Sequence, residues 1–196
     1  MTQQPTDPIP TNPPPTPRAA SRLPVWARVL AFVVLAAFLV AIALGLRRST
    51  QGAVVEGQRI PPVRLTTFDN TIVDTTSPEL SGKVIVINFW ASWCNPCASE
   101  AAALEQAWEY YQPGGKVVFL GIDYVDTEPE AKAYLAKYGV TYPNGPDLGT
   151  LASHAFRITG VPETYIINRQ GKLAHTQIGP FQTEQDILAV IDPLLK

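Results

Sequence analysis

Residues 84–97 read VIVINFWASWCNPC, and they decide the fold of this 196-residue chain. Six of the first seven are β-branched or aromatic, which is typical of a buried strand. The next three form a short connection, after which an Ala- and Glu-rich stretch of helical type begins. The sequence therefore predicts a strand that delivers two cysteines to the start of a helix.

Cys94 and Cys97 are placed for exchange between thiols and disulfides. Unpaired N–H groups and the positive end of the helix dipole stabilise a thiolate at the first position, which lowers the pKa of that thiol. Cys94 is therefore the predicted nucleophile. Cys97 lies one turn later on the same face, so we predict that it resolves a mixed disulfide formed at Cys94. Pro96 suits the first helical turn, where its missing N–H loses no partner.

Two other interpretations of the pair are weaker. These are the only cysteines in the chain, so neither has a structural disulfide partner elsewhere. A zinc site needs four ligands, and only His154 and His175 are available besides the pair, in no zinc-type spacing. An inert buried pair does not account for the setting of strand, tryptophan and helix start. We therefore predict redox chemistry that needs neither a metal nor a bound cofactor.

The N-terminal part predicts a tail and a membrane anchor. Residues 1–24 contain eight prolines and almost no large apolar side chains, so a disordered or polyproline-like tail is expected. Residues 29–46 are uncharged and mostly apolar, and as a helix they would span about 27 Å, close to the thickness of a hydrocarbon core. We predict a transmembrane anchor over 25–46, followed by a linker over 47–56.

A cleaved signal peptide is the alternative to an uncleaved anchor, because Ala41-Ile42-Ala43 offers small residues. The apolar run is longer than a usual signal core, which favours the anchor. Arginines flank the run on both sides in similar number, so charge bias does not select an orientation. Disulfide chemistry is most useful where disulfides persist, so we predict that the C-terminal domain is extracytoplasmic.

Residues 57–196 are enough for one compact domain. Residues 47–196 carry 12 basic and 16 acidic side chains, a net charge of −4, which gives no indication of nucleic-acid binding. Strand, helix and strand in succession predict a parallel pair. A Thr-x-x-Glu capping box is expected at Thr127. The predicted elements are a hairpin within 63–73, strands at 84–90, 116–123, 164–168 and 172–178, and helices at 95–111, 127–138, 148–156 and 183–195.

Two motifs in order carry a resemblance to a known family. Residues 89–97 read FWASWCNPC, and residues 160–164, GVPET, follow about 60 residues later and precede a strand, a hairpin and a final helix. This arrangement resembles the thioredoxin fold, and the anchor, the N-terminal hairpin and an insert around 134–147 resemble its membrane-tethered TlpA, ResA and CcmG (DsbE) branch. The resemblance covers 57–196 and implies an α/β domain, a mixed central sheet flanked by helices.

The resemblance also implies a substrate-binding edge. In that family the proline of the second motif forms a cis peptide bond beside the cysteines, which here is Pro162. The backbone of Val161 would then pair with an extended substrate near Cys94, as in strand addition. Trp93, next to Cys94, is expected to shield the disulfide and to offer an apolar contact to substrate, whereas Trp90 is expected to pack in the core.

The proton of Cys97 must be exchanged with a nearby acid or base. Asn88 stands where the similar cytoplasmic thioredoxins carry a buried Asp, so another group must exchange a proton with Cys97. Glu100 is the first candidate, because it follows Cys97 by three residues and resembles an acidic residue at that offset in ResA-like proteins. Glu163, beside Pro162, is the second candidate and also a predicted substrate-binding residue. The alternative for both is a solvated surface carboxylate.

The predicted function is thiol-disulfide oxidoreductase. The resemblance implies reduction of haem-attachment cysteines of apocytochrome c, with a membrane dithiol relay as electron donor. The direction of electron flow follows from the resemblance alone, because a stabilised Cys94 thiolate favours the reduced form and hence oxidant behaviour. The alternatives are a copper-binding assembly protein for a respiratory oxidase, a peroxidase, and a tethered binding module. Ala91 stands where a peroxidase of the peroxiredoxin type would carry Thr.

Overall fold

The computed structural model describes residues 24–49 and 54–196, without side chains for 43–49. The two stretches belong to separate compact units, and each is described by itself. The predicted tail, apart from Pro24, and residues 50–53 of the predicted linker lie outside the described residues.

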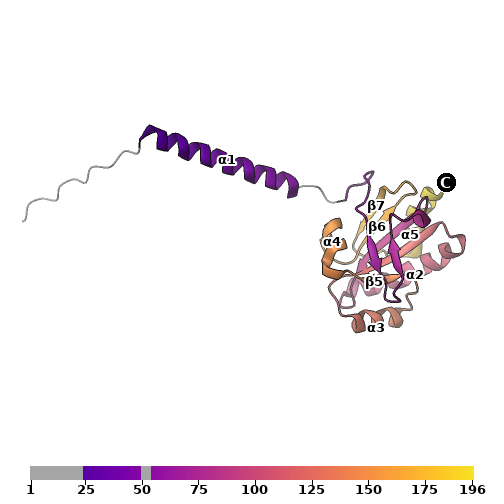
Figure 1. The fold of residues 1–196 in the computed structure, drawn as a ribbon. Helices are drawn as coiled ribbons and strands as arrows, with labels where there is room; N and C mark the ends of the chain where they lie inside the picture. Colours follow the sequence, from indigo (N-terminus) through magenta and orange to yellow (C-terminus); the bar gives the residue numbers. More distant parts are fainter. Residues whose placement is uncertain (1–23, 50–53) are drawn as a thin grey trace, which may run out of the picture. The chain divides into compact units, whose positions relative to one another are not determined.

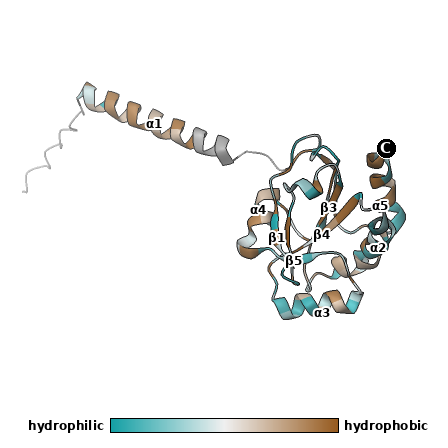
Figure 2. Ribbon diagram, turned by 45° about the vertical axis from the view of Figure 1, so that its right-hand side comes forward, coloured by the Kyte–Doolittle hydropathy of each residue, from teal (hydrophilic) through white to brown (hydrophobic). Residues whose placement is uncertain are grey.

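Helix α1, Val25–Ser49, occupies the stretch where the anchor is predicted. Its apolar side chains from Val25 to Ile42 are largely exposed, and Figure 2 shows them as a mostly brown helix. This segment is long and apolar enough to cross a membrane, and no other helix of the described part meets both conditions. The helix is therefore confirmed, whereas its insertion into a membrane stays a prediction.

The second unit is built on a five-stranded mixed sheet in the order β5-β4-β3-β6-β7. Figure 1 labels β5, β6 and β7 of this sheet and shows the helices around it. The central strand β3 pairs with β4 in parallel and with β6 antiparallel, while β5 extends the parallel side and β7 the antiparallel side. The predicted βαβ unit and C-terminal hairpin are thereby confirmed. The bounds are β3 Val84–Trp90, β4 Val117–Asp123, β5 Asn144–Pro146, β6 Glu163–Ile167 and β7 Leu173–Ile178.

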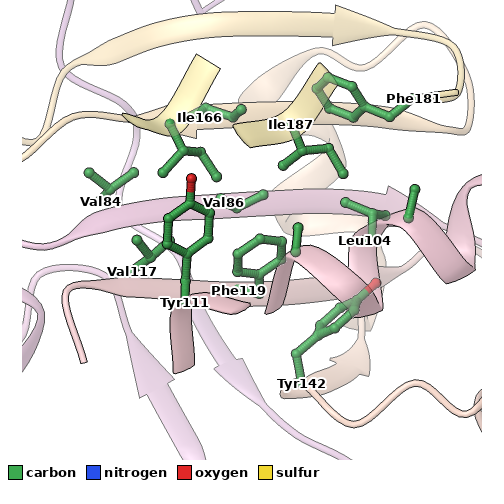
Figure 3. Close-up of a cluster of buried hydrophobic side chains, with 13 residues drawn as sticks. Val84, Val86, Leu104, Tyr111, Val117, Phe119, Tyr142, Ile166, Phe181 and Ile187 are labelled. Carbon is green, nitrogen blue, oxygen red and sulfur yellow. The ribbon is translucent and has the colours of Figure 1, made fainter. Parts of the chain in front are cut away.

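Strand β3 lies at the centre of the sheet, and every one of its seven residues is buried, as its mostly apolar composition predicts. Its alternate residues supply two separate cores. Val84 and Val86 face helices α2 and α5, and Figure 3 shows them with Leu104 and Ile187 of those helices. Phe89 and its neighbours on the other face pack with the N-terminal hairpin and with α4.

Four helices surround the sheet: α2 Asn95–Tyr111, α3 Glu128–Tyr138, α4 Leu151–Phe156 and α5 Glu184–Ile191. Helix α3 buries Ala131 and Tyr134 and is otherwise largely hydrophilic (Figure 2). The N-terminal hairpin consists of β1 Arg64–Thr66 and β2 Ile72–Asp74, which confirms the predicted hairpin and extends it by one residue beyond 73.

Four local predictions differ from the structure. Strand β5 is missed because its sequence, Asn-Gly-Pro, has the composition of a turn. The capping box at Thr127 is wrong, since its hydroxyl donates to the Glu130 carboxylate and caps no backbone N–H. The helix predicted over 148–156 is regular only from Leu151, because Gly149 has a left-handed φ of 65° that interrupts the first turn. The final helix likewise ends at Ile191 and continues as a 3-10 turn.

Candidate active site

The end of β3 and the start of α2 place the two cysteines as predicted. Residues 91–93 turn the chain after Trp90, and Cys94 directly precedes the helix, with extended backbone angles of φ −87° and ψ 104°. The backbone N–H of Cys97 donates to Sγ of Cys94 at 3.1 Å. In the dithiol form this N–H group and the helix dipole favour a thiolate at Cys94.

The two sulfurs form a disulfide, with the Cα atoms 5.3 Å apart. Both cysteines are buried, Cys94 with 4% and Cys97 with 1% of its surface exposed. A groove of about 330 Å³ beside α2 and α3 is lined by Cys94 together with Tyr134 and Tyr138, while Cys97 is absent from its lining. A molecule in this groove therefore meets the sulfur of Cys94 first.

The segment before β6 lies against the disulfide. The peptide bond between Val161 and Pro162 is cis, in agreement with the expectation from the resemblance. The carbonyl oxygen of Val161 lies 3.5 Å from Sγ of Cys94, and the carbonyl of Pro162 accepts a hydrogen bond from the N–H of Gly179. The predicted substrate edge and the predicted nucleophile are thus brought together.

Glu100 is buried under the same helix, with 1% of its surface exposed, so a solvated carboxylate is excluded. Its Oε1 accepts a hydrogen bond from Nδ2 of Asn88 at 2.8 Å, and its Oε2 accepts one from the N–H of Phe181 at 3.1 Å. Burial raises the pKa of Glu100 to about 7, against the lowering effect of these two bonds. Glu100 therefore changes charge near neutral pH, on the helix face that carries Cys97.

Glu163 is also buried, and both of its carboxylate oxygens accept hydrogen bonds. Its Oε1 accepts hydrogen bonds from the N–H and hydroxyl of Thr159 and from the N–H of Gly160, and its Oε2 accepts one from the Tyr165 hydroxyl. These bonds hold the loop that leads to Val161. The surface alternative is excluded, and the geometry favours a role for Glu163 in positioning the loop over direct contact with substrate.

The two tryptophans differ in their surroundings. Trp90 is buried, stacks on Tyr134 with ring centroids 4.6 Å apart, and donates from Nε1 to Oδ1 of Asn144, which confirms its packing role. Trp93 is 58% exposed, and its Nε1 donates to the carbonyl of Val125. A large exposed apolar surface thus lies next to Cys94, where a substrate contact is predicted.

A pair of acidic residues beside the site escapes the sequence analysis. Asp123 ends β4 opposite Trp90, is buried, and has no hydrogen-bond partner for Oδ1 among the described residues. Burial, followed by the charge of Asp126, raises the pKa of Asp123 to about 8. Asp126 accepts a hydrogen bond from the N–H of Ser92 at 2.6 Å and so supports the turn before Cys94. Asp123 lies at the carboxyl end of β4, a parallel strand next to β3, and this position in the sequence could have indicated it as a site residue.

Comparisons with known proteins agree with this site. Residues 57–176 match the AhpC/TSA family. The thiol:disulfide interchange protein HelX of Rhodobacter capsulatus is 32% identical over 170 residues, which are 85% of this chain and 93% of HelX. DsbE of Allochromatium vinosum is 34% identical over 56% of this chain, and ResA of Bacillus cereus is 29% identical over 55%. These two matches span 59% of DsbE and 61% of ResA.

Solved structures show the same fold. A thiol:disulfide interchange protein of the thioredoxin family from Chlorobium tepidum has a TM-score of 0.64 and 26% identity, over 74% of this chain and all of that one. A second structure from the same organism, described as a putative DsbE, has a TM-score of 0.66 at 21% identity. The chain belongs to the AhpC/TSA family and is a thioredoxin-fold thiol-disulfide oxidoreductase of the HelX, ResA and DsbE type.

Proposed function

We propose that this protein is a membrane-anchored, extracytoplasmic protein-disulfide reductase that acts on the haem-attachment cysteines of apocytochrome c. The observation that carries the proposal is the position of Cys94, which lines an open groove and whose Sγ lies 3.5 Å from the carbonyl oxygen of Val161, while Cys97 is absent from the groove lining and more deeply buried. The names of the relatives HelX, ResA and DsbE support disulfide exchange as the reaction. The apolar helix α1 supports the anchor.

The reaction starts from the dithiol form. The Cys94 thiolate attacks one sulfur of a substrate disulfide, which forms a mixed disulfide and releases the other substrate sulfur as a thiolate. Cys97 then loses its proton and attacks Sγ of Cys94, which releases the second substrate sulfur and closes the disulfide seen here. Two electrons pass to the substrate, and the released thiolates take up two protons. A membrane dithiol relay then reduces the protein again.

The chain's own groups support each step. The helix start stabilises the Cys94 thiolate, and Glu100, which titrates near neutral pH, takes the proton of Cys97. The backbone of the half-buried Val161, beside Cys94, aligns an extended substrate, and the exposed Trp93 covers the apolar side of that substrate. Glu163 keeps that backbone in place through the loop at Thr159 and Gly160.

Replacing Cys97 with alanine should trap the substrate. Without the resolving thiol, the mixed disulfide at Cys94 persists, so a covalent complex should accumulate and disappear on treatment with a reductant. Mass spectrometry of the complex identifies the partner, and a peptide containing Cys-x-x-Cys-His is the expected one. The control is the variant with both cysteines replaced by alanine, which should trap nothing. A complex made only with other proteins would refute the proposed substrate.

The reduction potential tests the direction of electron flow. A reductant should have a potential near or below about −200 mV, whereas a value near about −120 mV is typical of a strong oxidant. Equilibration of the Cys94 and Cys97 pair with a glutathione buffer, followed by mass spectrometry of alkylated protein, gives the value. An oxidant-like potential would reverse the proposed direction without affecting the assignment of the two cysteines.

Protease treatment tests the proposed location. In intact spheroplasts an added protease should digest residues 54–196, because the domain is expected outside the cytoplasmic membrane. An antibody against the C-terminus reports the loss, and a cytoplasmic marker must stay intact as the control. Full protection of the domain until the cells are lysed would contradict the orientation.

A further inference from the structure

The domain carries a second cavity at the end of the sheet opposite the disulfide. It has a volume of about 520 Å³ and lies where β3 begins and β6 ends, since Ile85 and Ile167 pair in the sheet and both line it. Cys94 follows the other end of β3, and a seven-residue strand separates the two ends by about 20 Å. The cavity is therefore distinct from the redox site.

Three cations meet at this cavity from separate parts of the chain. Arg59 comes from the segment before the N-terminal hairpin, Lys83 from the residue before β3, and Arg169 from the turn between β6 and β7. None of the described residues that line the cavity is Asp or Glu, and Glu79 in the adjoining 3-10 turn is not among them. Among the described residues, no acidic side chain forms an ion pair with any of the three.

This arrangement is unusual for a domain of this charge. Residues 54–196 carry ten basic and sixteen acidic side chains, a net charge of −6. Three like charges around one cavity repel each other, and in an acidic domain partners of opposite sign are plentiful. Their convergence without a carboxylate creates a local positive potential that an anion would neutralise.

The guanidinium of Arg169 is held at the rim by a hydrogen bond, and that of Arg59 lies close to the same turn. Nε of Arg169 donates to the carbonyl of Gly82 at 3.1 Å. Nη1 of Arg59 lies 3.5 Å from the position that a Cβ would take on Gly171, so its guanidinium covers the hairpin turn. A held guanidinium loses little side-chain freedom when it binds an oxyanion. Four hydroxyl groups also line the cavity. Those of Thr75 and Thr76 already donate to the carbonyl of Val63 and the carboxylate of Asp74, so the available donors are the hydroxyls of Ser77 and Ser81.

Arginine, lysine and hydroxyl donors that approach from several directions match a tetrahedral group with several acceptor oxygens. We propose that this cavity is a binding site for a phosphate group, carried either by a lipid headgroup or by a small soluble phosphate. The site is independent of the proposed redox function, because none of its residues contacts the cysteines.

The path of the chain favours the lipid source. The N–H of Gly57 donates to the carbonyl of Leu173, and the N–H of Leu173 donates to the carbonyl of Gln58. The backbones of Arg59 and Lys172 form an isolated antiparallel β-bridge. The described N-terminal segment of the domain therefore pairs with the β6-β7 hairpin beside the cavity, and in the sequence residues 50–53 separate this segment from helix α1. An anionic membrane surface attracts each nearby basic residue by about 1 kcal/mol.

Hydrogen exchange of the full chain tests the site in two arms. In neutral detergent micelles, inorganic phosphate is compared with sodium chloride at equal ionic strength. In nanodiscs without added phosphate, phosphatidylglycerol is compared with phosphatidylcholine. The readout is the exchange rate of the amides of residues 168 and 170–172, whose N–H groups are bonded within the turn that carries Arg169. We expect at least fivefold slower exchange with phosphate or with the anionic lipid.

The pattern of protection separates the two sources. Slower exchange with inorganic phosphate assigns the site to soluble phosphates, whereas slower exchange in phosphatidylglycerol discs alone assigns it to a lipid headgroup. The protection should vanish in Arg59→Gln/Lys83→Gln, in which Arg169 is retained because it holds Gly82. Lys132→Gln/Lys137→Gln on α3 removes the same charge and should keep the protection.

Two results would overturn the site. One is the absence of protection in both arms, and the other is protection that is equal in the wild type and in Arg59→Gln/Lys83→Gln. Insulin reduction by the double variant shows that the domain is folded. If the double variant is inactive, the experiment is repeated with the single variant Arg59→Gln, which changes an exposed side chain. Protection of the turn that is unchanged in this variant would also overturn the site.

Discussion

Replacing Glu100 with glutamine should slow the resolving step about 100-fold above pH 7, within the usual range for loss of a general base. In the wild type the rate should rise through pH 7 as Glu100 ionises and becomes able to accept the proton of Cys97. Glutamine cannot accept that proton, so the inflection should disappear. The measurement is the rate at which Cys97 expels glutathione from a preformed mixed disulfide at Cys94.

A matched control is available on the same helix. Glu105 is buried as well, and its carboxylate accepts hydrogen bonds from the N–H and hydroxyl of Thr141. Glu105→Gln should leave the rate and its pH profile unchanged. If Glu100→Gln kept the inflection near pH 7, another group would be the base, and Glu100 would be a structural residue.

Stability gives a second readout for the same change. Burial raises the pKa of Glu100 from 4.5 to about 7, so folding favours its protonated form, and the associated stability is lost as the pH rises from about 4.5 through 7. A glutamine at this position does not ionise, so the variant does not lose this stability. As the pH rises from 5 to 8, the unfolding free energy of the wild type should therefore fall by about 2 kcal/mol relative to that of Glu100→Gln.

Gly121→Ala should destabilise the folded domain by about 3 kcal/mol or more, which lowers Tm by about 10 °C. A Cβ on Gly121 would lie 2.9 Å from Nε1 of Trp90 and would overlap Oδ1 of Asn144. The hydrogen bond between these two buried groups occupies the space that glycine leaves. Alanine would break this bond, shift β5 from its neighbour β4, and disturb the stacking of Trp90 on Tyr134.

Thermal unfolding of the oxidised protein measures the effect. Gly114→Ala is the control, because a Cβ there meets no atom within 4 Å and its φ is not left-handed. We expect this control to change the unfolding free energy by less than about 0.5 kcal/mol. Equal Tm values for Gly121→Ala and the wild type would show that Asn144 has room to move aside.

The sequence predicts the central elements well where the pattern of side chains is local. The mostly apolar run of β3 and the cysteines after it are readable because strand, turn and helix start are contiguous. The cis bond before Pro162 is different, since most X-Pro bonds are trans and only the family resemblance indicates it. Strand β5 is unreadable because its pairing with β4, and not its composition, makes it a strand.

The candidate site shows the same limit. The offset of Glu100 from Cys97 places both on one helix face, but the depth of its carboxylate depends on groups far along the chain. Asn88 precedes it by 12 residues and Phe181 follows it by 81. Asp123 is a second example, since its burial depends on packing against β3 and the turn before Cys94. Spacing gives candidates, and tertiary packing decides which of them have unusual acidity.

The concealment of Cys97 behind Cys94 also constrains the kinetics. Because the groove gives access to Cys94 and not to Cys97, the oxidised substrate and the reducing partner must both form their bond with the same sulfur. The two partners then exclude each other from one surface, and no ternary complex lies on the pathway. Turnover should consequently follow ping-pong kinetics, with each partner inhibiting competitively when it is present in excess.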